Sequence, residues 1–323
     1  MRAAQVVRLD GPEAIEVNEV PEPKPGDDQV LIEVHAAGLT FPDVLLTRGL
    51  YQLKPEPPFT PGSEIAGVVR SAPEGAAVKP GDRVAAFPGI GGLQELVAVP
   101  PHMVFALPDP MSYAAGAGVP MNYLTVHFAL VRRGQLAAGE TVLVHGAAGG
   151  VGTAAIQLAK ALGATVIAVA SSEEKRAVAR QAGADETIAV DGFKDAAKAL
   201  TNGRGVDVVV DPVGGDRFTD SLRSLAPEGR LLVIGFTGGE IPTVKVNRLL
   251  LNNVAVVGVG WGAYALPRPD FVPAQWADLL PHLESGALDP VLGETYPLGR
   301  TAEAIAAMEQ RQATGKLIID FAR

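Results

Sequence analysis

The sequence predicts an α/β fold with two structurally different halves, and three observations support this prediction. Up to about residue 120, short alternating segments such as residues 30–35 and 65–70 are separated by turns rich in proline and glycine. From about residue 122 to 260, continuous apolar segments alternate with alanine-rich helical segments. The length of 323 residues allows about two domains, each with its own core.

The first half is expected to be mainly antiparallel β-structure. Alternating apolar and polar residues place the apolar side chains on one face of a strand. Residues 79–84 read Lys-Pro-Gly-Asp-Arg-Val, in which proline fixes φ and glycine accepts a positive φ. This segment therefore predicts a tight turn that leads into a strand.

The second half is expected to contain a parallel sheet with helices on both faces, because its strands are apolar throughout. The final segment, residues 261–323, contains two helical patterns and ends in a strand-like run at residues 316–321. The expected strands are residues 141–145, 165–170, 206–210 and 230–234, and the expected helices are residues 152–162, 173–182, 218–225, 271–284 and 301–312.

The composition excludes several classes of function. The net charge is −9, so we expect neither nucleic acid nor an anionic membrane surface as a partner. The chain has no cysteine, which excludes disulfides, thiolate nucleophiles and cysteine-ligated metals. Uncharged runs at residues 110–131, 141–159 and 249–267 are interrupted by proline, glycine or an Asn pair, so we interpret them as buried core. The N-terminus lacks a signal-peptide pattern, and we expect a cytoplasmic protein.

The strongest motif is a glycine-rich turn between an expected strand and an expected helix. Residues 141–152 read TVLVHGAAGGVG, and a helical segment follows. In this context the backbone N–H groups and the positive end of the helix converge where a pyrophosphate can bind. Gly149 permits close approach of the backbone, and Gly152 lets the helix pack against the strand. We therefore expect Gly149, Gly150, Val151 and Gly152 to bind a dinucleotide.

The end of the next strand bears on the choice of cofactor. An NAD site usually places a carboxylate there, whereas this chain has Ser171 and Ser172, followed by Lys175 and Arg176. Hydroxyl groups and cations would accept a 2′-phosphate, so Ser171, Ser172 and Lys175 favour NADPH. The alternative interpretation is that Ser171 and Glu174 form a capping box and that the two cations are ordinary surface residues.

Five segments together resemble the zinc-independent quinone oxidoreductase branch of the medium-chain dehydrogenases/reductases, the group that includes zeta-crystallin. They are residues 36–43 (AAGLTFPD), 48–51 (RGLY), 61–69 (PGSEIAGVV), 147–152 (AAGGVG) and 315–318 (GKLI). The resemblance covers nearly the whole chain. It implies a GroES-like catalytic domain with a distorted β-barrel at residues 1–121, a Rossmann domain that binds NADPH at residues 122–262, and a return to the catalytic domain at residues 263–323.

The resemblance also implies the absence of zinc. Zinc alcohol dehydrogenases of the same superfamily have cysteine and histidine where this chain has Thr40 and Ser63, and hydroxyl groups are poor replacements for these ligands. Without a Lewis acid, reduction of an electrophilic acceptor is easier than oxidation of an alcohol. We therefore expect hydride transfer from NADPH to quinones or to α,β-unsaturated carbonyl compounds. Thr40 and Tyr51 are the candidate catalytic residues by position, although Tyr51 could equally close a turn.

Other positions implied by the resemblance contact or wall the nicotinamide half of the cofactor. They are Asn122, Thr125, Gly235, Phe236, Thr237, Val259, Gly260 and Trp261. Residues 253–258 resemble an edge strand that pairs two copies of such a chain, so we expect a homodimer. Two alternatives stay open: an enoyl-thioester reductase of the acryloyl-CoA type, and a crystallin-like protein that binds NADPH without catalysis.

Overall fold

The computed structural model describes residues 1–322, which form two compact units. Unit 1 comprises Met1–Met121, Pro269–Ala277 and residues 292–322. Unit 2 comprises Asn122–Arg268 and Asp278–Val291. The chain thus leaves unit 1 for unit 2 and returns to unit 1 for its final strand.

Unit 1 is built on a seven-stranded mixed sheet. The strand order is β14-β15-β3-β4-β5-β7, and β6 pairs with β3. Every pair is antiparallel except β14 with β15, and a separate antiparallel pair, β1 with β2, completes the unit. The strands are β1 (Arg2–Val6), β2 (Ile15–Glu19), β3 (Val30–Gly38), β4 (Glu64–Ser71), β5 (Arg83–Ala86), β6 (Leu96–Val99), β7 (Val104–Ala106), β14 (Leu292–Pro297) and β15 (Lys316–Asp320), and the helices are α1 (Phe41–Thr47), α2 (Tyr113–Gly116) and α11 (Thr301–Glu309).

The alternating pattern of β3 explains its place at the centre of this sheet. Val30, Ile32 and Val34 are buried, and the side chains between them are partly exposed. The C-terminal β15 pairs antiparallel with the end of β3, with Ile318 opposite Gly38. The end of the chain is therefore an internal strand of the unit 1 sheet, and the antiparallel structure predicted for the first half is confirmed.

Unit 2 is a six-stranded parallel sheet in the order β10-β9-β8-β11-β12-β13. The strands are β8 (Thr141–Val144), β9 (Thr165–Ala170), β10 (Glu186–Ala189), β11 (Val206–Asp211), β12 (Leu225–Val233) and β13 (Ala255–Gly258), and the helices are α3 (Pro120–His127), α4 (Gly150–Ala161), α5 (Glu173–Gln181), α6 (Phe193–Leu200), α7 (Phe218–Ser224), α8 (Asn247–Asn252) and α9 (Trp261–Ala265). Helix α10 (Phe271–Glu284) divides between the two units.

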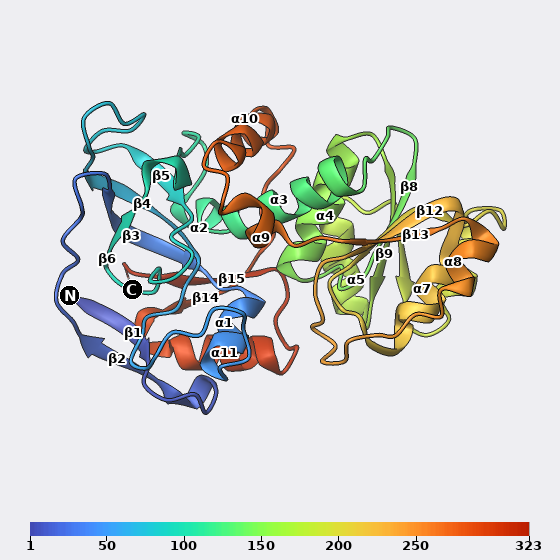
Figure 1. The fold of residues 1–323 in the computed structure, drawn as a ribbon, viewed down its shortest axis with the longest axis horizontal. Coiled ribbons are helices and arrows are strands. Elements are labelled where there is room, and N and C mark those ends of the chain that lie inside the picture. The colour runs from blue at the N-terminus through green and yellow to red at the C-terminus, as the bar shows by residue number, and fades with distance from the viewer. Residues whose placement is uncertain (323) are drawn as a thin grey trace. The chain divides into compact units, whose positions relative to one another are not determined.

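Helices cover both faces of the unit 2 sheet, with α4 and α5 on one side and α7 and α8 on the other (Figure 1). On the second side, Leu143, Val209 and Leu231 of three adjacent strands pack against Phe193 of α6 and Phe218 of α7. When the six strands are numbered 1 to 6 along the chain, their order across the sheet is 3-2-1-4-5-6, which is the arrangement of a Rossmann fold. The predicted parallel sheet is thus confirmed.

No helix among residues 1–322 has the length and apolar character that a membrane crossing requires.

Candidate functional site

The predicted cofactor residues of unit 2 follow the strands of the parallel sheet. The glycine turn follows β8, the two serines follow β9, Gly235–Thr237 follow β12 and Val259–Trp261 follow β13. Because all six strands are parallel, their carboxyl ends meet at one edge, where open α/β sheets bind ligands. The structure therefore brings these segments to a single edge of unit 2.

The glycine turn joins β8 to α4 within five residues. Gly149 N donates to Gly146 O (3.0 Å) and is the N-cap residue of α4. A glycine cap offers no side-chain acceptor, so the first N–H groups of this 12-residue helix are available to an anion. A Cβ on Gly152 would lie 2.2 Å from Gly146 O and 2.7 Å from the Cα of Ala147. Helix α4 therefore packs so closely on the turn that only glycine fits at residue 152.

Asn122 of α3 lies directly against this turn. A Cβ on Gly150 would be 2.4 Å from Asn122 Nδ2, and Asn122 is 5% exposed. Thr125 follows one turn later on the same helix and is also buried. The structure thus places the amide of Asn122 beside the first residue of α4.

At the end of β9, the structure corrects the alternative interpretation of the capping box. Ser172, and not Ser171, is the N-cap residue of α5, and its Oγ accepts a hydrogen bond from Lys175 N (3.2 Å). Lys175 therefore occupies the third helical position that the alternative gave to Glu174. Arg176 forms an ion pair with Glu173 (2.8 Å).

The loops after β12 and β13 are fixed by backbone hydrogen bonds. Thr237 N donates to Pro212 O (3.1 Å), and Val259 N donates to Val233 O (2.9 Å). Val259 and Trp261 are buried, and Gly260 between them is exposed. Phe236 lies against Gly214, because a Cβ on Gly214 would be 2.8 Å from the Cδ1 of Phe236. These loops form an ordered wall at the carboxyl edge.

In unit 1, Thr40 is the N-cap residue of α1 and contacts two polar side chains. Its backbone N–H and its hydroxyl both donate to Asp43 Oδ2, at 2.8 and 2.7 Å. Thr40 Oγ1 also lies 3.4 Å from Ser63 Oγ. Asp43 is completely buried and accepts a third hydrogen bond from Gly62 N (2.9 Å). Burial nevertheless raises the pKa of Asp43, against the lowering effect of these hydrogen bonds.

A second buried carboxyl group, Glu64, lies at the start of β4 and pairs with Lys316 of β15. Lys316 Nζ also donates to Leu39 O (2.8 Å), and Glu64 Oε2 accepts from Met121 N (2.7 Å). Glu64 is fully buried and Lys316 is 3% exposed. Asp43, Glu64 and Lys316 are not among the predicted site residues, although the Thr-x-x-Asp spacing of residues 40–43 matches a helix-capping pattern.

Tyr51 follows α1 after a short turn and is partly buried. Its ring packs against the apolar cluster of Val6, Leu46 and Phe59. Its hydroxyl has no hydrogen-bond partner within residues 1–322. Burial, and secondarily the charge of Asp43, raise the pKa of Tyr51. The phenol therefore stays protonated at neutral pH and can donate a hydrogen bond, as a role toward a substrate carbonyl requires.

The groups near Thr40 do not match the ligand chemistry of zinc. Zinc sites in proteins use thiolate, imidazole and carboxylate ligands. Here the two groups that face each other are neutral hydroxyls, Asp43 is occupied by three donors, and Glu64 is paired with an ammonium group. The part of the chain that the structure describes has no group of three His, Cys, Asp or Glu side chains able to hold a metal.

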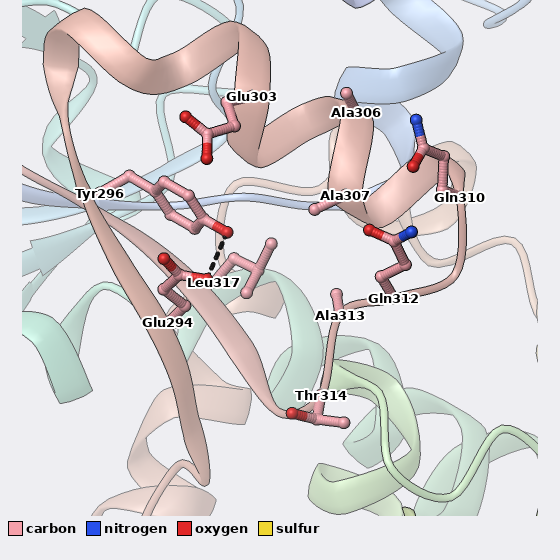
Figure 2. Close-up of a pocket in the computed structure, with 10 residues that line it drawn as sticks. All are labelled: Glu294, Tyr296, Glu303, Ala306, Ala307, Gln310, Gln312, Ala313, Thr314 and Leu317. Carbon is pink, nitrogen blue, oxygen red and sulfur yellow. Dashed lines mark hydrogen bonds between the residues drawn. The ribbon is translucent and has the colours of Figure 1, made fainter. Parts of the chain in front are cut away.

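Figure 2 shows a separate cavity of unit 1, of about 370 Å³, between β14, α11 and the segment before β15. Tyr296 Oη donates to Glu294 Oε2 (2.7 Å), and Glu303 is the second carboxylate of its lining. Burial and the Glu294 carboxylate raise the pKa of Tyr296 to about 12. None of the predicted site residues lines this cavity, and its carboxylates would repel the phosphates of a dinucleotide.

Comparison with known proteins matches each half of the chain to a protein family. Residues 26–109 match the family described as alcohol dehydrogenase GroES-like domain, and residues 150–285 match the family described as zinc-binding dehydrogenase. The quinone oxidoreductase-like protein 2 of Bos taurus is 38% identical over 99% of this chain and 92% of its own length.

Solved structures agree with this assignment. A probable oxidoreductase from Mycobacterium abscessus is 45% identical with a TM-score of 0.91, and covers 99% of this chain and 98% of its own. The quinone oxidoreductase of Thermus thermophilus, solved alone and with NADPH, is 37% identical with a TM-score of 0.86, and covers 99% of this chain and all of its own. The chain therefore belongs to the quinone oxidoreductases, an oxidoreductase family of the medium-chain dehydrogenases/reductases.

Proposed function

We propose that this chain is an NADPH-dependent, zinc-independent reductase that transfers hydride to quinones or to activated α,β-unsaturated carbonyl compounds. The observation that carries the proposal is the junction of β8 and α4, where a glycine turn packs on an uncapped helix N-terminus at the carboxyl edge of a parallel sheet. The Thermus thermophilus relative with the same fold was solved in complex with NADPH, which supports this choice of cofactor.

We expect different residues at the carboxyl edge of the unit 2 sheet to bind different parts of NADPH. The N–H groups at residues 150–152 would bind the pyrophosphate, and the Asn122 amide beside them would position the adjoining half of the cofactor. Ser171, Ser172 and Lys175 at the end of β9 would bind the 2′-phosphate. The loops at residues 235–237 and 259–261 would hold the nicotinamide half and exclude water from it.

In unit 1, Tyr51 and Thr40 would act on the acceptor. NADPH supplies the hydride when it is bound. The Tyr51 hydroxyl, which is protonated and has no partner within residues 1–322, would donate a hydrogen bond to the acceptor carbonyl and withdraw electron density from it. Acceptors that are already electrophilic need no Lewis acid. The hydroxyl groups of Thr40 and Ser63, which are poor metal ligands, support this choice of acceptor.

The test is NADPH oxidation by the purified chain with quinones, enones and enoyl-CoA esters, with analysis of the products. Hydroquinone or saturated carbonyl products are expected, and NADH should be the poorer donor. Turnover confined to enoyl-CoA would replace the proposal with an enoyl-thioester reductase. Thermal stabilisation by NADPH without turnover of any acceptor would indicate a binding protein of the crystallin type.

We further propose that the chain forms homodimers in the cytoplasm. Strand β13 is the last strand of the unit 2 sheet, and within residues 1–322 it pairs only with β12. Four large apolar side chains in the segment before this strand are strongly exposed: Ile241, Val246, Leu250 and Leu251, each at 71–76%. A second copy that pairs along β13 would extend the sheet and cover this surface.

A further inference from the structure

A short chain of hydroxyl groups in unit 1 ends on a buried carboxyl group. Thr40 Oγ1 donates to Asp43 Oδ2 (2.7 Å), which uses the only hydrogen of the Thr40 hydroxyl. In the 3.4 Å contact between Thr40 Oγ1 and Ser63 Oγ, Ser63 must therefore be the donor while Asp43 is ionised. Every hydroxyl hydrogen then points toward Asp43. The directions reverse when Asp43 carries a proton.

Within residues 1–322, Asp43 has no cation in direct contact, although three ionisable groups act on it. Lys316 of β15 contacts Glu64 and Leu39 O instead. Glu64 of β4 is a second buried acid, and the Tyr51 phenol, which stays protonated, is close enough for the charge of Asp43 to raise its pKa. The remaining contacts of the carboxyl group are the N–H groups of Thr40 and Gly62. Burial raises the pKa of Asp43, so this group takes up a proton more readily than an exposed aspartate.

We propose that Asp43, Thr40 and Ser63 form the proton-transfer chain that completes reduction of the acceptor. This inference rests on the proposed function. Hydride addition brings two electrons to the acceptor and leaves an enolate or hydroquinone oxygen with a negative charge. The Ser63 Oγ–H bond then breaks as its proton moves to that oxygen, the Thr40 proton moves to Ser63, and the Asp43 proton moves to Thr40.

The transfer is balanced and returns the chain to the arrangement described above. The carboxyl group becomes a carboxylate, the acceptor O⁻ becomes O–H, and no electrons move along the hydroxyls. The Thr40 hydroxyl then donates to ionised Asp43, as the structure shows. Thr40 and Ser63 are buried, so the proton that restores Asp43 would return by the reverse steps, through Ser63 and then Thr40.

The same residues also cap α1, so the experiment must separate the two roles. Capping uses the backbone N–H of Thr40, the Asp43 carboxyl group and Thr40 Oγ1 as the acceptor of the Asp43 backbone N–H. Proton transfer also needs the hydrogen of Thr40 Oγ1, and a loss of capping alone would affect every acceptor equally. Thr40→Val keeps the shape and the backbone contact but removes the hydroxyl, and Thr40→Ser restores it. Thr47→Val is the matched control, because Thr47 is a buried threonine of the same helix whose hydroxyl donates only to Val44 O (2.8 Å).

The experiment compares two acceptors whose reduced forms differ in basicity. Cyclohexenone gives a strongly basic enolate that needs a proton, whereas a tetrahalogenated benzoquinone gives a weakly basic anion that does not. A general acid contributes about 10²–10⁴-fold, so Thr40→Val should lower kcat with cyclohexenone roughly 100-fold, a loss at least about tenfold greater than its effect on kcat with the quinone. Thr40→Ser and Thr47→Val should stay within about threefold of the wild type for both acceptors. With cyclohexenone, the wild-type kcat should fall as pH rises through the pKa of Asp43, and this dependence should disappear in Thr40→Val.

Each other outcome overturns the inference. A wild-type rate for Thr40→Val with cyclohexenone, or an equal loss with both acceptors, overturns proton transfer but leaves the proposed function intact. A wild type that reduces neither acceptor overturns both. A measurement independent of turnover is the infrared spectrum across a pH titration. A protonated carboxyl band should shift in Thr40→Val, because its hydrogen-bond partner is lost, and should vanish in Asp43→Asn. The absence of any such band in the wild type also overturns the inference.

Discussion

The close packing of α4 on the glycine turn makes Gly152→Ala a quantitative test of the cofactor site. The added Cβ would lie 2.2 Å from Gly146 O and 2.7 Å from the Cα of Ala147, and both are backbone atoms that cannot rotate away. Overpacking of this kind costs about 1–3 kcal/mol, and contacts this short belong at the upper end of that range. Alanine regains at most about 1 kcal/mol in helix propensity. We therefore expect a net loss of about 2 kcal/mol in the free energy of unfolding.

The consequence for binding follows from the same displacement. The turn must move away from α4, so the N–H groups at residues 150–152 no longer converge on one point. Loss of one charge-assisted hydrogen bond, worth about 1.5–3 kcal/mol, should weaken NADPH binding roughly 10- to 100-fold. For a unit of this size, a loss of about 2 kcal/mol lowers Tm by roughly 4–8 °C.

The assays are thermal unfolding of the chain without ligand and fluorescence titration with NADPH, and Gly149→Ala is the control. A Cβ on Gly149 would be 3.5 Å from Gly146 O, an ordinary contact, and the backbone there is extended. Gly149→Ala should therefore retain nearly the wild-type Tm. Wild-type Tm and affinity in Gly152→Ala, or an equal fall of Tm in both variants, would refute the reasoning.

Three further predictions concern the cofactor, acid stability and assembly. Lys175→Glu should raise KM for NADPH at least about tenfold and leave KM for NADH nearly unchanged, because the substitution reverses one charge beside the 2′-phosphate. The control Lys198→Glu, in the last turn of α6, should affect neither KM. Arg230 donates two hydrogen bonds to the Glu140 carboxylate, and these bonds lower the pKa of Glu140. The contribution of this ion pair to the free energy of unfolding is therefore complete above the pKa that Glu140 has in the unfolded chain, and it is lost as the pH falls through the lower pKa of the folded protein. Urea unfolding of Glu140→Gln should show a loss of about 1–3 kcal/mol at pH 7 that shrinks below about pH 4. Leu250→Glu should give a monomer in light scattering, and a wild-type monomer would contradict the proposed dimer.

The parallel sheet and its glycine turn could be predicted because their signals are local. Strand β11 has six consecutive buried residues, so its sequence indicates a strand covered on both faces. The turn before α4 needs small residues wherever backbone meets backbone, and this requirement is visible in the sequence of residues 146–152. Shared direction of the strands then places every following loop at one edge, which is why the predicted cofactor segments lie together.

Two features could not be predicted in the same way: the residue that caps α5, and the cluster of buried ionisable side chains in unit 1 formed by Asp43, Glu64 and Lys316. Two adjacent serines have similar capping propensities, and the path of the chain after β9 decides that Ser172 caps the helix. The Lys316 contact with Leu39 O joins residues 277 positions apart, so it exists only once β15 has paired with β3. Pairings of this range leave no periodic pattern in the sequence.

The charge balance around Thr40 supports the proposed proton transfer in unit 1. Of the two buried acids, Asp43 and Glu64, only Glu64 forms an ion pair with the buried Lys316 among the described residues. The hydrogen bonds to an ionised Asp43 come from neutral donors, the charge of Lys316 helps from a greater distance, and burial acts against the negative charge. A zinc ion could neutralise this charge but would need soft or imidazole ligands, which Thr40 and Ser63 do not provide. A proton needs only hydroxyl groups to carry it. In the proposed mechanism, the hydroxyls of Thr40 and Ser63 therefore carry a proton between Asp43 and the acceptor.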